Sequence, residues 1–65
     1  MLKMIDLLTV CNDDMKINVF NEECDLIKRV DNRNDIPVGL SLNYIEWIHP
    51  IRENELNIGL AYTKK

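Results

Sequence analysis

The sequence predicts an α+β fold in which a short N-terminal helix packs on a small antiparallel sheet of about four strands. Three observations predict this class: apolar residues at helical spacing near the start, later stretches that alternate apolar and polar residues with the period of a strand, and short polar clusters between these segments. The 65 residues suffice for one small domain, residues 1–65, whose limited core leaves it marginally stable. Each large apolar residue is therefore expected to matter for stability.

The predicted helix lies within residues 2–10. Its apolar positions at helical spacing are Leu2, Ile5 and Leu8, flanked by Met4 and Leu7. The pattern ends at residues 11–14, Cys-Asn-Asp-Asp, because Asn and Asp side chains compete for backbone hydrogen bonds and favour turns. We therefore expect a short amphipathic helix with one face on the sheet.

The first predicted hairpin joins a strand at residues 15–20 to a shorter strand within residues 24–30, through a turn at residues 21–23. Apolar and polar residues alternate along the first strand, as they do on a strand with one buried face. The residues expected on the buried face of this hairpin are Met15, Ile17, Val19, Cys24, Leu26 and Val30. Phe20 falls out of phase with that face.

A loop and a second hairpin make up the rest of the chain. Residues 31–40 contain several Asn and Asp, a proline and a glycine, so we expect a loop with one helical turn after Asp35 that plugs an end of the core. The strongest strand pattern lies at residues 55–62, and its predicted partner is the stretch 43–51, Asn-Tyr-Ile-Glu-Trp-Ile-His-Pro-Ile. The isoleucines of that stretch repeat every three residues, so a strand that directs all of them to the core needs a bulge.

The charge balance disfavours direct binding to nucleic acid. Eleven acidic residues outnumber eight basic ones, for a formal net charge of −3, whereas binding to phosphate backbones depends on clustered Lys and Arg. The basic residues form no obvious stripe along the chain. No apolar run approaches the ~20 residues of a membrane span, and the first residues lack the features of a signal peptide, so we expect a cytoplasmic protein that does not bind membranes.

Neither a catalytic centre nor a metal or cofactor site is expected. His49 is the one histidine, the two glycines form no phosphate-binding loop, and no serine stands in a nucleophile-elbow motif. Cys11 and Cys24 are too few for a tetrahedral zinc site. We expect two reduced thiols in or near the core; a single disulfide between them stays open. A Cys–His catalytic pair also stays open, although so small a domain leaves little room for a substrate pocket.

Six residues are candidates for binding a partner protein. They are Trp47, Phe20 and Tyr44, together with the carboxylates Glu22, Glu23 and Asp25 of the first hairpin. Aromatic residues of this kind are enriched at the energetic centres of interfaces, and a group of carboxylates can dock on a basic groove. The competing interpretation is that Trp47 belongs to a two-sided core and that the carboxylates are solvated turn residues.

The chain resembles, over almost its whole length, a family of small proteins encoded by phages and other mobile elements of low-GC Gram-positive bacteria. The segments that carry the resemblance are, in order, DLL (6–8), MKINVFNEE (15–23), DIP (35–37) and IEWIHPIRENELNI (45–58). Where the family has a glycine in its first turn, this chain has Asn-Glu-Glu-Cys at 21–24. The resemblance implies a helix with an antiparallel sheet and a phage origin, and some small phage proteins inhibit host immunity, as anti-CRISPR proteins do.

The residues and the resemblance together lead to one expected function and two alternatives. We expect a non-enzymatic phage-type module that binds a host protein, such as a defence nuclease, and occludes its surface. The first alternative is a homodimer or another homo-oligomeric structural or assembly subunit of a phage complex. The second alternative is an enzyme, which would require an activated thiol at Cys11 or Cys24.

Overall fold

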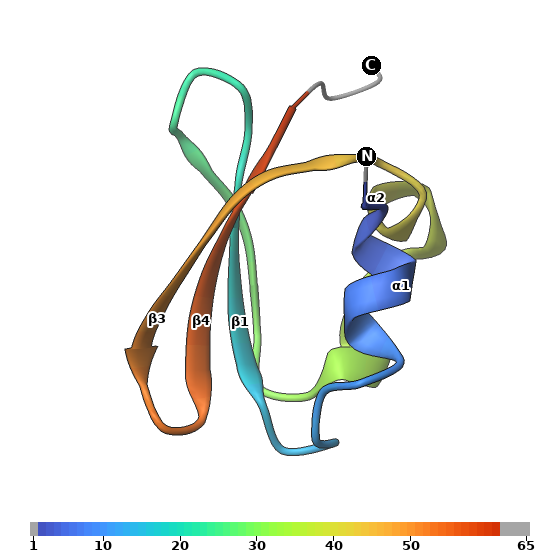
Figure 1. The fold of residues 1–65 in the computed structure, drawn as a ribbon, viewed down its shortest axis with the longest axis vertical. Helices are drawn as coiled ribbons and strands as arrows, with labels where there is room; N and C mark the ends of the chain where they lie inside the picture. Colours follow the sequence, from blue (N-terminus) through green and yellow to red (C-terminus); the bar gives the residue numbers. More distant parts are fainter. Residues whose placement is uncertain (1, 62–65) are drawn as a thin grey trace.

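The computed structural model describes residues 2–61, in which two short helices lie on one side of a four-stranded sheet (Figure 1). The elements along the chain are α1 (Met4–Leu8), β1 (Lys16–Phe20), β2 (Leu26–Val30), the 3-10 turn η1 (Arg33–Asp35), α2 (Val38–Ser41), β3 (Ile45–Arg52) and β4 (Glu55–Leu60). The predicted α+β class, the N-terminal helix and the four strands are confirmed. Tyr62, which the sequence pattern assigned to the last strand, lies outside the described residues.

The strand order β2-β1-β4-β3 places the two hairpins side by side. Within each hairpin the strands are antiparallel, as predicted, whereas β1 and β4 pair in parallel and make the sheet mixed. A parallel pair needs a long crossover, which here is supplied by everything between β1 and β4, including both short helical segments after β2. The parallel pair therefore fills the centre of the sheet, and β2 and β3 form its edges.

The core lies between the sheet and the helical layer. Its buried apolar residues are Met4, Ile17, Val19, Val30, Ile36, Ile45, Ile58 and Leu60. Four of these eight residues lie on the central strands β1 and β4, which have a neighbouring strand on each side. Ile36, in the segment between η1 and α2, is buried against them, which confirms that the middle loop contributes to the core.

The buried face of α1 differs from the predicted one. Met4 is completely buried, whereas Leu2 and Ile5 are 46% and 42% exposed, so the prediction that Leu2 and Ile5 face the core is wrong. With only five residues, α1 is oriented by backbone bonds to the start of β3 rather than by its own periodicity. The N–H of Met4 donates to the carbonyl of Asn43 at 2.9 Å, and the N–H of Ile45 donates to the carbonyl of Leu2 at 2.7 Å.

A bulge in the first hairpin reverses the alternation along β2. Val30 lies opposite Ile17 on the core face, but the register shifts further along, and Leu26 lies opposite Phe20 on the other face. Leu26 is 48% exposed. The prediction that Cys24, Leu26 and Val30 share a buried face is therefore wrong, because one extra residue turns Leu26 over and because Cys24 lies in the turn.

β3 contains two irregularities, between Ile45 and Trp47 and between Pro50 and Arg52. The first allows Ile45 and Ile48 to point to the same side although they are three residues apart, opposite buried residues of β4. The predicted irregularity is present, but it does not bury all three isoleucines, since Ile45 is in the core whereas Ile48 and Ile51 are 41% and 46% exposed. The irregularity between Ile45 and Trp47 turns Trp47 away from the core.

The β1–β2 turn forces a residue with a side chain into the left-handed backbone region. Cys24 has a φ of 66°, a conformation that hairpin loops of this kind commonly need at their last position and that favours glycine. Asn21 holds the turn in shape, because its side-chain oxygen accepts hydrogen bonds from the N–H groups of Glu23 and Asp25, both at 2.9 Å. The turn is therefore well defined and strained at one residue.

Changing Cys24 to Gly is expected to raise the free energy of unfolding by about 1 kcal/mol, because glycine adopts a positive φ without the steric cost of a Cβ. The Cys24 thiol is free and exposed, so little packing is lost. Urea denaturation followed by circular dichroism measures the change. Cys24→Ala is the control, since it removes the sulfur and keeps the Cβ; equal midpoints for the Gly and Ala variants would contradict the strain.

Candidate functional site

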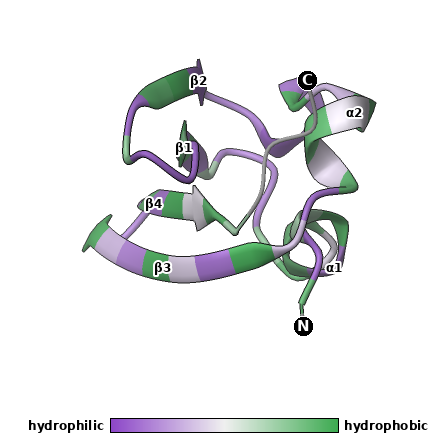
Figure 2. Ribbon diagram, turned by 90° about the horizontal axis from the view of Figure 1, so that it is seen from above, coloured by the Kyte–Doolittle hydropathy of each residue, from purple (hydrophilic) through white to green (hydrophobic). Residues whose placement is uncertain are grey.

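The face of the sheet opposite the helices carries the candidate site, and we refer to it as the open face. Figure 2, which looks down on the fold, shows both helices on one side of the sheet. The pairing register arranges the open face in three rows across the strands. The first row is Leu26, Phe20, Gly59 and Trp47, the second is Arg29, Asn18, Asn57 and His49, and the third is Lys16, Glu55 and Arg52.

An aromatic pair laid over a glycine forms the first row. The ring centroids of Phe20 and Trp47 are 5.6 Å apart, and the ring planes are inclined by 36°. The indole of Trp47 lies directly over Gly59, since a Cβ added there would come within 2.6 Å of Trp47 Cδ1. Both aromatic side chains are half-buried and neither belongs to the buried core.

The position of Phe20 and Trp47 on a shared face opposite the helices agrees with the phase of the sequence pattern. Gly59, by contrast, is not among the predicted site residues. A glycine inside a strand often marks a close approach by another group. Gly59 is such a glycine, and the group that approaches it is the Trp47 ring. The ring occupies the space that any side chain at position 59 would need.

A hydrogen-bond network centred on the buried Asn18 links the second row to Glu55 of the third. Asn18 is only 3% exposed although it lies on the open face. Its Nδ2 donates to Glu55 Oε2 at 2.9 Å and to Asn57 Oδ1 at 3.0 Å, and its Oδ1 accepts from Arg29 Nε at 2.9 Å. Because Asn18 is satisfied on every side, the network fixes Arg29 and Glu55 on the surface.

The open face is more basic than the chain as a whole. Lys16, Arg29 and Arg52 share it with one carboxylate, Glu55, whereas the chain carries a net charge of −3. In the part of the chain that the structure describes, none of these three cations has a carboxylate within ion-pair distance. Sequence reasoning missed this group because its members come from three different strands.

The predicted acidic residues lie at the end of the open face that carries the aromatic pair. Glu22, Glu23 and Asp25 belong to the β1–β2 turn, immediately after Phe20. Figure 1 shows this hairpin extending past the end of the sheet and leaning away from α1. The structure therefore brings the acidic turn together with Phe20 and, through the first row, with Trp47.

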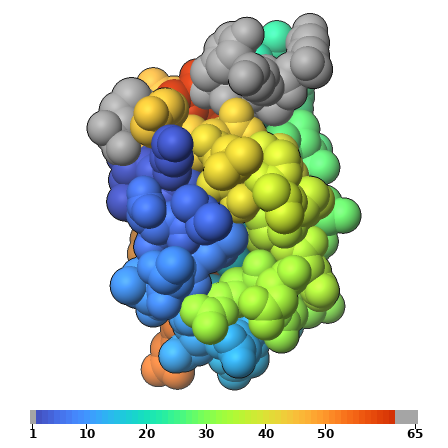
Figure 3. Space-filling model, turned by 90° about the vertical axis from the view of Figure 1, so that its right-hand side faces the viewer, coloured from blue at the N-terminus to red at the C-terminus, as the bar shows by residue number. Residues whose placement is uncertain are grey.

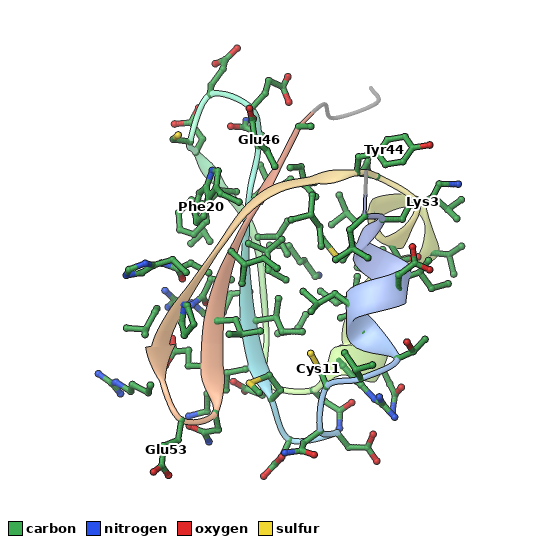
Figure 4. All side chains as sticks on the ribbon, viewed as in Figure 1. Lys3, Cys11, Phe20, Tyr44, Glu46 and Glu53 are labelled. Atoms are coloured by element: carbon green, nitrogen blue, oxygen red, sulfur yellow. The ribbon has the colours of Figure 1, made fainter. Side chains whose placement is uncertain are left out.

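Tyr44 lies apart from the other candidates. It precedes β3, forms an isolated bridge with Lys3, and its ring centroid is 5.6 Å from Lys3 Nζ. Figure 4 places Tyr44 near α1 and Phe20 on the opposite side of the sheet. The aromatic cluster on the open face is therefore a pair rather than a trio.

The groups considered for catalysis are separated. Cys11 follows α1 on the helical side, where the Nη1 of Arg33 donates to its carbonyl at 2.7 Å, and His49 lies on the open face. Burial raises the pKa of the Cys11 thiol, and the charge of Arg33 offsets part of that rise, so the thiolate is less populated than in an ordinary cysteine. Cys24 is exposed in the turn, which corrects the prediction that both thiols lie in or near the core.

A shallow depression between α1 and the η1–α2 segment is one alternative site (Figure 3). It has a volume of about 440 Å3, and Ile5, Thr9, Arg33 and Ser41 contribute to its lining. Arg33 already has partners, since Nη1 donates to the carbonyl of Leu8 at 2.7 Å and Nε pairs with Asp13 at 2.8 Å. The arginine therefore fastens the loop to the end of α1.

Comparisons with protein families, curated proteins and solved structures find no match. Within residues 2–61, no three His, Cys, Asp or Glu side chains are placed to hold a metal ion. The same residues contain no helix that is long and apolar enough to cross a membrane. The open face, with its aromatic pair and its separated charges, is therefore the strongest candidate site on geometric grounds.

Proposed function

We propose that this chain is a non-enzymatic protein-binding module that holds its partner on the open face. The observation that carries the proposal is the place of Phe20 and Trp47, half-buried on the open face and outside the core. A small domain that holds its single Trp and single Phe outside its core leaves them free to bury against another surface.

The open face is also suited to binding because its groups are held in place before a partner arrives. Trp47 rests on the backbone of Gly59, and Arg29 is bound by the buried Asn18. Side chains that are already ordered lose little conformational entropy on association, so more of the contact energy appears as affinity.

The resemblance to phage-encoded proteins directs this proposal towards a host protein. The target would be a defence protein such as a nuclease, inhibited by occlusion of its surface. A nuclease needs a basic groove for the phosphate backbone, and the acidic turn formed by Glu22, Glu23 and Asp25 would dock there while Phe20 and Trp47 bury beside it.

Affinity capture from a Gram-positive host tests the proposal. Tagged wild type and Tyr44→Ala should retain the same host protein, because Tyr44 is exposed away from the open face. Trp47→Ala should weaken retention about thirtyfold, since truncating a central interface Trp costs roughly 2 kcal/mol or more.

Circular dichroism spectra establish that each captured variant is folded. Trp47→Leu, which keeps an apolar cover over Gly59, serves as the second variant if Trp47→Ala does not fold. A folded Trp47 variant that retains the host protein as well as wild type does would overturn the use of the open face.

A second candidate function is a homo-oligomeric structural or assembly subunit of a phage complex. One feature of the open face favours this second function. Acidic and basic groups lie on opposite sides of the aromatic pair, so two copies can complement each other. Size-exclusion chromatography with light scattering distinguishes the two functions: a dimer that persists at nanomolar concentration would support an assembly subunit, and dissociation at micromolar concentration would support a binding module.

A further inference from the structure

We propose that the open face also binds a second copy of this chain, in a weak two-fold symmetric dimer that a target protein would displace. The inference rests on the proposed function, because it uses the same face, and it names an additional partner. It starts from the distribution of charge around the aromatic pair, which is opposite in sign on the two sides.

On one side of Phe20 and Trp47 lies a basic block, formed by Lys16, Arg29 and Arg52 of the second and third rows. On the other side lies the β1–β2 turn, with the exposed residues Glu23 and Asp25. The hairpin that carries this turn leans away from α1 (Figure 1). A flat partner that covered the open face would meet the acidic turn and the basic block at once.

A two-fold axis that lies in the plane of the interface and runs along the aromatic row makes the face complementary to itself. Phe20 and Trp47 of one protomer would then contact the same pair of its partner. The acidic turn of each protomer would lie over the basic block of the other, and this contact would occur twice. Closed two-fold contacts of this kind are the commonest symmetry of protein dimers.

Edge-to-edge pairing of strands is the competing way to form a dimer, and the edges oppose it. Pro50 lies in the edge strand β3 and has no N–H to donate to an added strand. The other edge strand, β2, carries Lys28 and Arg29 and is interrupted by a bulge. Charged side chains and bulges are features by which natural sheets avoid edge pairing.

The size of the molecule indicates that the dimer is weak. The protein measures 28 × 20 × 19 Å, so one face offers on the order of 500 Å2, below the roughly 800 Å2 per partner of a typical stable complex. A contact of this size would dissociate at micromolar concentration. It would still cover the aromatic pair at high protein concentration, and a target with a larger complementary surface would replace the second copy.

Sedimentation equilibrium of the full chain over micromolar to millimolar concentrations tests the proposal. Wild type should associate reversibly to a dimer, and more weakly at high salt. Two charge-reversal variants should each be monomeric over most of this range, with the dissociation constant raised about tenfold or more. They are Glu23→Lys with Asp25→Lys, and Lys16→Glu with Arg52→Glu.

An equimolar mixture of the two variants should regain dimers, because each reversed patch then meets an oppositely charged patch on the other chain. A control matched to the acidic-turn variant, Asp14→Lys with Asp35→Lys, makes the same change in net charge as Glu23→Lys with Asp25→Lys, at exposed residues off the open face, and should dimerise at least as well as wild type. Circular dichroism confirms that all variants fold.

Two results would overturn the dimer: a wild type that stays monomeric at millimolar concentration, or charge-reversal variants whose mixture does not associate. Either result leaves host-protein capture through Trp47 standing as a separate finding. Conversely, if the dimer forms but the Trp47 variant captures the host protein as well as wild type does, the proposed host-binding function is wrong and the dimer stands.

Discussion

Replacing Gly59 with Ala is expected to lower the free energy of unfolding by roughly 1–3 kcal/mol, the usual cost of forcing an extra group into a filled space. The new Cβ would come within 2.6 Å of Trp47 Cδ1 and closer still to two other atoms of the indole. The indole ring would have to move off the backbone of Gly59 and would lose its contact with Phe20. Urea denaturation measures the loss, and a red shift of the indole fluorescence reports the displaced ring.

A double-mutant cycle isolates the contact between Gly59 and Trp47. In a Trp47→Ala background, Gly59→Ala should be neutral or stabilising, because the obstacle is gone and Ala is the better residue in a strand by roughly 0.5–1 kcal/mol. Gly39→Ala is a matched control, since a Cβ added at Gly39 meets nothing within 4 Å. Equal losses with and without the indole would contradict the packing of Trp47 on Gly59.

Truncation of Ile58 to Ala is expected to have the largest effect on stability, a loss of roughly 2–5 kcal/mol. Ile58 is completely buried in the central strand β4, between Val19 of β1 and Ile48 of β3. A domain of this size has only roughly 3–10 kcal/mol to lose, so the variant should be largely unfolded at 37 °C. Circular dichroism and the thermal midpoint measure the change.

Two milder substitutions serve as comparisons for the loss of stability expected from Ile58→Ala. Ile58→Val removes one methyl group and should cost roughly 0.5–1.5 kcal/mol. Ile48→Ala removes the neighbour of Ile58 on the edge strand, where the side chain is 41% exposed, and should cost clearly less than Ile58→Ala. Similar losses at positions 48 and 58 would contradict the assignment of the centre of the core to β4.

The parts of the fold that follow from local alternation could be predicted from the sequence. Ile17 and Val19 are buried as their spacing indicates, and Phe20 lies on the opposite face because it is out of phase with them. Trp47 joins Phe20 because of the irregularity in β3, which the three-residue repeat of the isoleucines indicated. Alternation reports which side of a strand a residue takes, and it needs no knowledge of the partner strand. The aromatic part of the candidate site could therefore be predicted from the sequence.

The rest depends on register between distant segments, which local patterns do not carry. The parallel pairing of β1 with β4 brings Asn18 beside Asn57 and Glu55 and creates the network centred on Asn18. The basic block likewise exists only once three strands are aligned. The exposure of Leu26 depends on a single extra residue in β2, which places Leu26 on the face opposite to the one that unbroken alternation with Val30 would give it.

The order of the strands has a consequence for how the protein is made. β4, the last strand that is described, fills the middle of the sheet beside β1, which comes near the beginning. On the ribosome, the earlier hairpin therefore lacks its central neighbour until residues 55–60 have emerged, and an isolated pair of strands is barely stable in water. Folding of the sheet must therefore wait for β4, and the newly made polypeptide exposes the apolar side chains of the earlier strands until that strand has emerged.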